Sequence, residues 1–317
     1  MAYIQTLTCI LMTVIKNLKD LNQDEKILDK SIRLCSLEDN SFNDIKEITE
    51  DILNSIDEDI KVVNEYNKHF LNFIYFQQNL LEFDRFCKTL NNIPVTYIDI
   101  NKFITTQEFI YANRIVFNLL TSFKFFIDSS GIHIKRRFGN ESEYVKKFEN
   151  RTNKFFDDYF SYRFLVKLRN YTVHFGFPIN LIPFNAIADY VNPERMIGSL
   201  SLVVDREEFL KEKSFFGAKV TRDLTEMTED INVIPLINEL GKLIFKLEKY
   251  IYSLHQVELE ESISNLKMFA QRFKTVNNEV SIIHSITQIG MKISAKTLTI
   301  PFDNIEEIEN FKIKNGC

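Results

Sequence analysis

The sequence predicts a mainly α-helical fold with a small β element. Only 8 glycines and 6 prolines occur in 317 residues, so few positions break a helix. Hydrophobic residues make up 45% of the chain and aromatic residues 13%, with 29 phenylalanines, which is enough to build a sizeable core. Long stretches repeat apolar side chains every three or four residues, as in Ile45, Ile48, Ile52, Ile56 and Ile60, and this spacing is typical of amphipathic helices.

The expected helices follow from this spacing and from capping residues. Helices are expected over residues 1–20, 24–36, 44–65, 67–90, 105–129, 140–159, 161–175, 227–253 and 256–273. Pro94 lies in a connector over 91–103, Gly131 is expected to end one helix, and Gly176 followed by Pro178 to end another. Residues 199–204 and 291–302 have the composition of short strands, and the two could pair in a small sheet.

These elements suggest three regions. Residues 1–100 form an N-terminal helical region, residues 101–253 a helical core with a short β insertion near 196–204, and residues 254–317 an extension of one helix and one strand. Four widely spaced cysteines (Cys9, Cys35, Cys87 and Cys317) favour free thiols over disulfides or zinc. The apolar run from Cys9 to Ile15 is too short to span a bilayer, so we expect a cytoplasmic protein without a membrane segment.

Charge is unevenly distributed along the chain. The net charge is −5, which argues against general binding to nucleic acid. Between Glu38 and Glu65 there are ten acids and two lysines, whereas His133 to His174 contains ten basic residues and five acids. A basic segment in an acidic chain indicates a local anionic ligand. The acidic stretch is expected to be a solvated helix face, or alternatively a docking surface for a basic partner.

The basic segment contains the one chemically informative motif, Arg169-Asn170-Tyr171-Thr172-Val173-His174. On the predicted helix, Arg163, Lys167, Asn170 and His174 share one side at spacings of four, three and four residues. Arg169 lies about 100° round the helix from Asn170, so its long side chain must bend to act with His174.

This set of side chains suits cleavage of RNA by its own 2′-hydroxyl. An imidazole such as that of His174 can move a proton near neutral pH. Arg169 can hold the phosphate through two hydrogen bonds and stabilise the added charge of the transition state, while Asn170 orients either group. The chemistry requires no metal or other cofactor, and the sequence offers no clear carboxylate cluster that would bind a metal. The alternative is that His174 only interacts with the C-terminal dipole of its helix.

The residues from Leu168 to Pro178 resemble a known signature. The pattern Leu168-Arg169-Asn170-Tyr171-x-x-His174-x-Gly176-x-Pro178, with its Tyr162-Arg163-Phe164-Leu165 lead-in, is similar to the Arg-polar-x(3–5)-His signature of the HEPN superfamily. The upstream helix, with Asn113-Arg114, Asn118 and Asp128, resembles the same group. The resemblance covers about residues 113–178 and extends at most to the helix ending near 253.

The resemblance implies a helical bundle that forms a homodimer, in which two Arg/His pairs meet in one composite cleft. Many such proteins are ribonucleases in toxin–antitoxin, anti-phage or CRISPR-associated systems, so RNA and an antitoxin or defence partner are the implied partners. Arg169 and His174 take the catalytic positions, and Asn170 the polar position after the arginine. Some family members carry a nucleotidylated tyrosine two residues after the histidine; Gly176 stands there in this chain.

Other polar residues are candidate RNA contacts. Besides Arg163 and Lys167, these are Arg114, Asn118, Lys135, Arg136 and Arg137. Arg114 and Asn118 belong to a polar stripe with Thr121 and Asp128, which either faces the Arg169/His174 cleft or forms a buried hydrogen-bond network. The basic run 135–137 either grips phosphates or is a solvated loop.

The sequence therefore predicts a dimeric, metal-independent endoribonuclease that leaves a cyclic phosphate and a 5′-hydroxyl. The alternative is a non-catalytic helical module that recruits a partner or senses a nucleotide.

Overall fold

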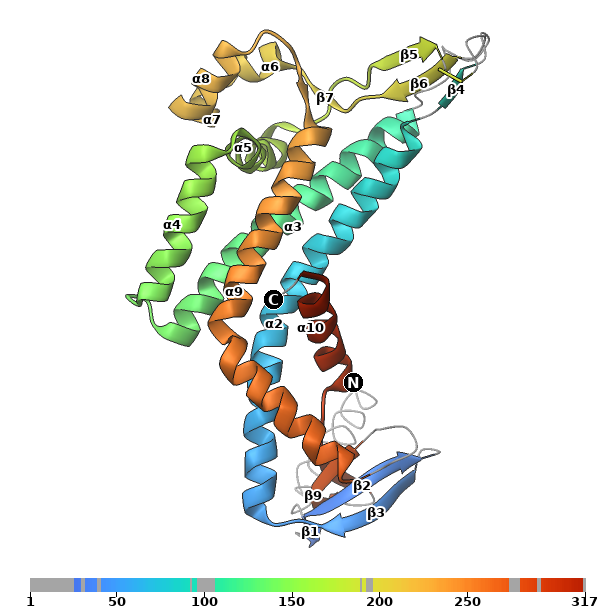
Figure 1. Cartoon of the computed structure of the whole chain (residues 1–317), viewed down its shortest axis with the longest axis vertical. Coiled ribbons are helices and arrows are strands. Elements are labelled where there is room, and N and C mark those ends of the chain that lie inside the picture. Colours follow the sequence, from blue (N-terminus) through green and yellow to red (C-terminus); the bar gives the residue numbers. More distant parts are fainter. Residues whose placement is uncertain are drawn as a thin grey trace, which may run out of the picture. The chain divides into compact units, whose positions relative to one another are not determined.

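The computed structural model describes residues 26–29, 32–38, 41–91, 93–95, 106–188, 190–191, 196–273, 280–289 and 292–315 (Figure 1). The chain is mainly helical with small antiparallel sheets, as the sequence predicted. It divides into two compact units. Unit 1 comprises Met1–Tyr66 and Gln256–Lys314, and unit 2 comprises Asn67–His255 and Asn315–Cys317.

Long helices dominate the described chain. The helices are α2 (Glu50–Thr89), α3 (Thr106–Phe138), α4 (Glu143–Asp158), α5 (Phe160–Phe175), α6 (Arg206–Lys211), α7 (Lys213–Phe216), α8 (Ala218–Glu226), α9 (Val233–Gln271) and α10 (Phe302–Asn315). Helices α2 and α9 each contribute residues to both units. The shorter helices α3 to α8 belong to unit 2, and α10 lies almost wholly in unit 1.

Unit 1 contains a five-stranded antiparallel sheet. Its strands are β1 (Lys26–Asp29), β2 (Arg33–Glu38), β3 (Ser41–Glu47), β9 (Val280–Ile289) and β10 (Lys292–Thr299). Strand β9 pairs with β10, β1 and β2, and β2 pairs with β3. In this register Leu34 lies opposite Ile282, and both side chains are fully buried, so the sheet has an apolar side.

Unit 2 contains two smaller antiparallel sheets at one end of its helices. In one, β6 (Met196–Leu200) pairs with β4 (Ile93–Val95) and with β5 (Phe184–Ala188). In the other, β7 (Val203–Val204) pairs with β8 (Ile231–Asn232) just before α9 begins.

The core of unit 2 is built around α3. Its buried side chains recur every three or four residues, and most of them are apolar, so one face of the helix is apolar along most of its length. The buried residues are Ala112, Asn113, Ile115, Val116, Leu119, Leu120, Ser122, Phe123, Phe126, Ser130 and Ile134. Phe126 packs on Phe73 of α2, and Phe73 in turn packs edge-on against Phe245 of α9. Phe123 packs against Tyr162 of α5.

Within the described residues, α3 is also the one helix whose length and composition would allow it to cross a membrane, and 44% of its most apolar window is buried in the protein.

The first predicted elements differ from the structure. The helix expected over 24–36 is wrong, because β1 and β2 lie there, and the helix expected to begin at residue 44 begins only at Glu50, because residues 44–47 belong to β3. Strands β1 and β2 pair with β9, about 250 residues away in the sequence, and local periodicity carries no information on such partners. The helix expected over 1–20 lies outside the described residues.

Several predicted helix ends are also wrong. Helix α2 runs without a break through the expected gap at residue 66, and α9 through the expected gap near 254. Helix α3 continues past Gly131, where an added Cβ would make only an ordinary 3.5 Å contact with Phe148. It ends before Gly139, whose φ of +88° suits glycine. The run 135–137 is therefore the last turn of α3 and not a loop.

The strand predictions are confirmed in part. Strand β10 covers most of 291–302, and β6 and β7 cover most of 199–204. Their proposed pairing is wrong, because β10 pairs with β9 and β6 pairs with β4 and β5. Strands β5 and β9 were not predicted, because their local sequence patterns are too weak.

Burial of α3 predicts a contrast between two nearby phenylalanines. Phe123 is fully buried, whereas Phe125 is 50% exposed. Phe123→Ala should lower the free energy of unfolding by about 3–5 kcal/mol, because it removes a large apolar side chain and leaves a cavity. Phe125→Ala on the same helix should change it by less than about 1 kcal/mol. Urea unfolding followed by circular dichroism measures both, and equal losses would contradict this packing.

Candidate functional site

Helix α5 carries the motif and is fixed on three sides. It begins after Tyr159, whose extended backbone (φ −115°, ψ 116°) separates it from α4, and it ends at Gly176, whose φ is +119°. The aromatic ring of Tyr162 packs against Phe123 of α3 and Phe155 of α4. On another side, Tyr171 packs on Phe209 of α6 and Phe216 of α7. The motif therefore sits on a rigid helix.

Arg163 and Lys167, the first two residues on the predicted polar side of α5, face α8. Arg163 Nε donates a 2.5 Å hydrogen bond to Asp223 Oδ2, and Nη1 donates to the carbonyls of Phe156 and Asp157. Both charged side chains are only 12% exposed. These contacts make Arg163 a connection between α5, α4 and α8. Lys167 lies one turn further on, half-buried, with its Nζ near Gly217 at the start of α8.

Arg169 and Asn170 contact each other in the middle of the motif. Arg169 Nη1 donates a 3.3 Å hydrogen bond to Asn170 Oδ1, and both side chains are half-buried. The buried Nε of Arg169 has no hydrogen-bond partner among the described residues. A buried donor without a partner costs free energy, so a movement of the Arg169 side chain that let an anionic ligand reach Nε would be favoured.

His174 lies in the last turn of α5 and is exposed. Its ring makes an edge contact with Phe215 of α7, with 5.9 Å between the ring centroids. Phe215 also meets Phe175 edge-on, so the imidazole lies beside aromatic side chains while remaining open to solvent. Burial and the nearby carboxylates of Glu208 and Glu212 raise the pKa of neighbouring Tyr171.

The structure separates the other predicted RNA contacts from one another. Arg114 pairs with Glu82 at 3.0 Å and lies over the Tyr111 ring, Asn118 is half-buried on α3, and Lys135 pairs with Glu149 at 3.1 Å. Arg136 is exposed and Arg137 half-buried at the C-terminal end of α3. Exposed pairs such as Arg114–Glu82 contribute little stability, so these cations can exchange partners at little cost.

Asn113, which lies outside the motif, forms hydrogen bonds with the segment that follows His174. Its side chain is fully buried on α3. Its Oδ1 accepts from the Ile179 N–H at 2.9 Å, and its Nδ2 donates to the Ile179 carbonyl at 3.2 Å. One amide thus satisfies both backbone groups of a buried residue. Asn180 next to it accepts a hydrogen bond from Asp205 N–H, which ties the same segment to α6.

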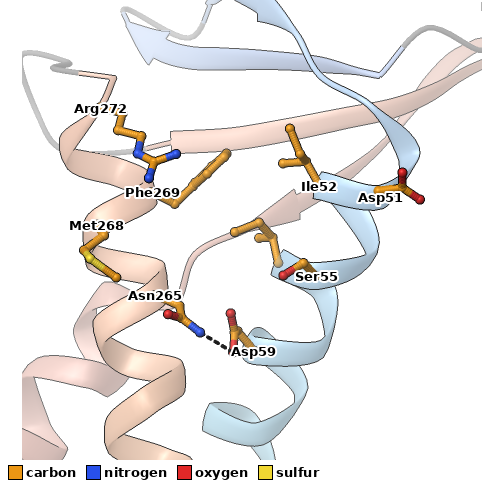
Figure 2. A pocket seen from close by; sticks show the side chains of 9 residues that line it. Asp51, Ile52, Ser55, Asp59, Asn265, Met268, Phe269 and Arg272 are labelled. Atoms are coloured by element: carbon orange, nitrogen blue, oxygen red, sulfur yellow. Dashed lines mark hydrogen bonds between the residues drawn. The ribbon is translucent and has the colours of Figure 1, made fainter.

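A surface groove of about 300 Å³ lies in unit 1 between the start of α2 and the end of α9 (Figure 2). Asp51 and Arg272 stand at opposite sides of it, and Asn265 donates a 3.5 Å hydrogen bond to Asp59 across it. Its exposed polar side chains carry both signs of charge and specify no particular ligand. Within the described ranges, no group of three or more histidine, cysteine or acidic side chains is arranged to hold a metal ion.

No family model, curated protein or solved structure matches this chain. The resemblance to HEPN proteins therefore rests on the motif residues alone.

The Asn113 contacts predict that removing this side chain destabilises the backbone at Ile179. Asn113→Ala should lower the free energy of unfolding by about 2–4 kcal/mol, because the buried N–H and C=O of Ile179 lose their partners. Hydrogen exchange at Ile179 should accelerate. Asn118→Ala is the matched control, since among the residues that the structure describes no such backbone contact involves Asn118. Unchanged hydrogen exchange at Ile179 would show that the two Asn113 hydrogen bonds do not hold this backbone in place.

Proposed function

We propose that this protein is an endoribonuclease of HEPN type that acts at the end of α5. The observation that carries the proposal is the combination of an exposed His174 with a half-buried Arg169 guanidinium, which contacts Asn170 on the same helix. An imidazole open to solvent and an arginine able to bind phosphate are the two groups that this cleavage needs.

The reaction is an internal transfer at phosphorus. One imidazole takes the proton of the 2′-hydroxyl, and the 2′-oxygen forms a bond to the adjacent phosphorus. The bond from phosphorus to the 5′-oxygen breaks, and this oxygen receives a proton from an imidazolium. The products are a 2′,3′-cyclic phosphate and a 5′-hydroxyl. Arg169 stabilises the charge of the transition state, and Asn170 orients the guanidinium through its Oδ1.

The surface around His174 supports action as a homodimer. Val173, Phe175, Phe177 and Leu181 are 50%, 49%, 55% and 45% exposed, and we call these four residues the 173–181 patch. These exposed apolar side chains lie within nine residues of one another in the sequence, and exposed apolar surface is typical of protein interfaces. A second copy covering this patch would bring two His174 side chains to one cleft, where one could act as base and the other as acid.

Cleavage assays on wild-type and variant protein test the activity. The wild type should cleave a panel of labelled tRNA and mRNA in EDTA, and His174→Ala and Arg169→Ala should each lose about 10²-fold or more in rate. His284→Ala, which removes a histidine of β9, is the control and should retain activity.

Cleavage that persists in His174→Ala would rule out this site. No cleavage by the folded wild type would favour the non-catalytic module, in which the same surface recruits a partner.

The 173–181 patch predicts a concentration-dependent dimer. Phe175→Asp should shift the protein towards monomer in analytical ultracentrifugation and lower cleavage in parallel, because it places a charge in an apolar interface. Leu71→Asp is the matched control, since Leu71 is 49% exposed on α2 and outside the patch. A dimer that survives Phe175→Asp would place the interface elsewhere.

A further inference from the structure

Three of the five histidines in the chain converge inside unit 2, although they are far apart in the sequence. His69 comes from α2, His133 from α3 and His255 from α9. The rings of His69 and His133 stack with their centroids 4.8 Å apart and their planes at 19°. The Nε2 atoms of His133 and His255 lie 3.0 Å apart, within hydrogen-bond distance. We call these three residues the histidine cluster.

The histidine cluster is largely closed to solvent. His69 is 2% exposed and His255 6%, while His133 is half-buried. Phe126 packs beside His69, and Phe138 beside His255. A carboxylate completes the group, because Glu248 Oε2 lies 2.8 Å from His69 Nε2 and is fully buried. The cluster thus joins three long helices through polar contacts in an apolar setting.

The geometry of the His133–His255 pair limits how many protons it can carry. When both rings are neutral, one Nε2–H donates to the lone pair of the other Nε2. A first added proton binds Nδ1 of the donating ring and leaves this hydrogen bond intact. A second added proton must bind the accepting Nε2, and two N–H groups then face each other at 3.0 Å. The hydrogen bond is lost, and two positive charges remain together.

We propose that the His133–His255 pair is an acid-sensitive lock, which ties α3 to α9 within unit 2 and opens when both imidazoles are protonated. It is independent of the proposed nuclease site, because none of its residues lies on α5.

Burial, and then the nearby basic side chains, oppose protonation of the pair. Facing it are His69 from α2 and Arg137 from α3, and Glu248 of α9 is engaged with His69. Burial, followed by His69 and Arg137, lowers the pKa of His133 to about 4. Burial, followed by His133, His69 and Arg137, lowers the pKa of His255 to about 3. Both rings are therefore neutral at pH 7, with the lock closed.

The sign of the pH effect follows from these lowered pKa values. In the unfolded chain an imidazole binds a proton below about pH 6.5, whereas in the folded protein these two rings resist doing so until about pH 4 and 3. The unfolded state therefore binds more protons in this range, and the folded protein loses stability as the pH falls below 6.5. Above pH 6.5 the neutral His133–His255 pair contributes its full stabilisation of the folded protein.

Unfolding of the full chain in urea at pH 7.0, 6.0, 5.0 and 4.5 tests the lock. For each of the two rings, the unfolding equilibrium constant should rise by up to about tenfold per pH unit below 6.5. In the double variant His133→Gln/His255→Gln this contribution should disappear, because an amide can keep the hydrogen bond without binding a proton. His284→Gln, outside the cluster, is the matched control and should follow the wild type.

A second measurement does not depend on the variants being stable. Titration of the histidine Cε1–H signals of the wild type by NMR should show two rings that remain neutral down to pH 5. Wild-type and double-variant proteins with the same pH dependence, or five rings that all become protonated above pH 6, would overturn the proposal.

Discussion

Burial of the apolar face of α3 is the constraint on which the rest of unit 2 depends. Its side chains contact α2 through Phe126 and Phe73, and α5 through Phe123 and Tyr162. The same helix supplies Asn113, which holds the segment after the motif, and His133, which belongs to the histidine cluster. Because interiors are close-packed, a shift of α3 would move all of these contacts together.

Helices α6 to α8 cover part of the motif helix α5 and leave the rest exposed to solvent. The rings of Phe209 and Phe216 pack on Tyr171, and this packing lays the short helices along α5. Asp223 pairs with Arg163 and covers the first part of the polar side of α5, whereas His174 remains exposed in its last turn. The closed end stabilises the fold, and the open end is where chemistry on an external ligand is possible.

The motif and its helix could be predicted from local sequence because the relevant signals are local. The apolar spacing of Phe164, Leu168 and Tyr171 and the stop at Gly176 give the helix and its end correctly. The role of Arg163 could not be predicted, because its partner Asp223 is 60 residues away on a short helix. For the same reason, the structural role of Asn113 could not be predicted, since its partner is the backbone of Ile179, 66 residues away.

The sequence by itself determined the mainly helical class, the position of α5 and the set of polar residues that α5 carries, because helix periodicity and capping act within a few residues. Only the tertiary structure decided that β1, β2 and β3 are strands, that α2, α3 and α9 continue past their expected ends, and that three distant histidines meet. Each of these depends on partners far away in the chain, and burial against such partners outweighs the modest local preferences of the residues concerned.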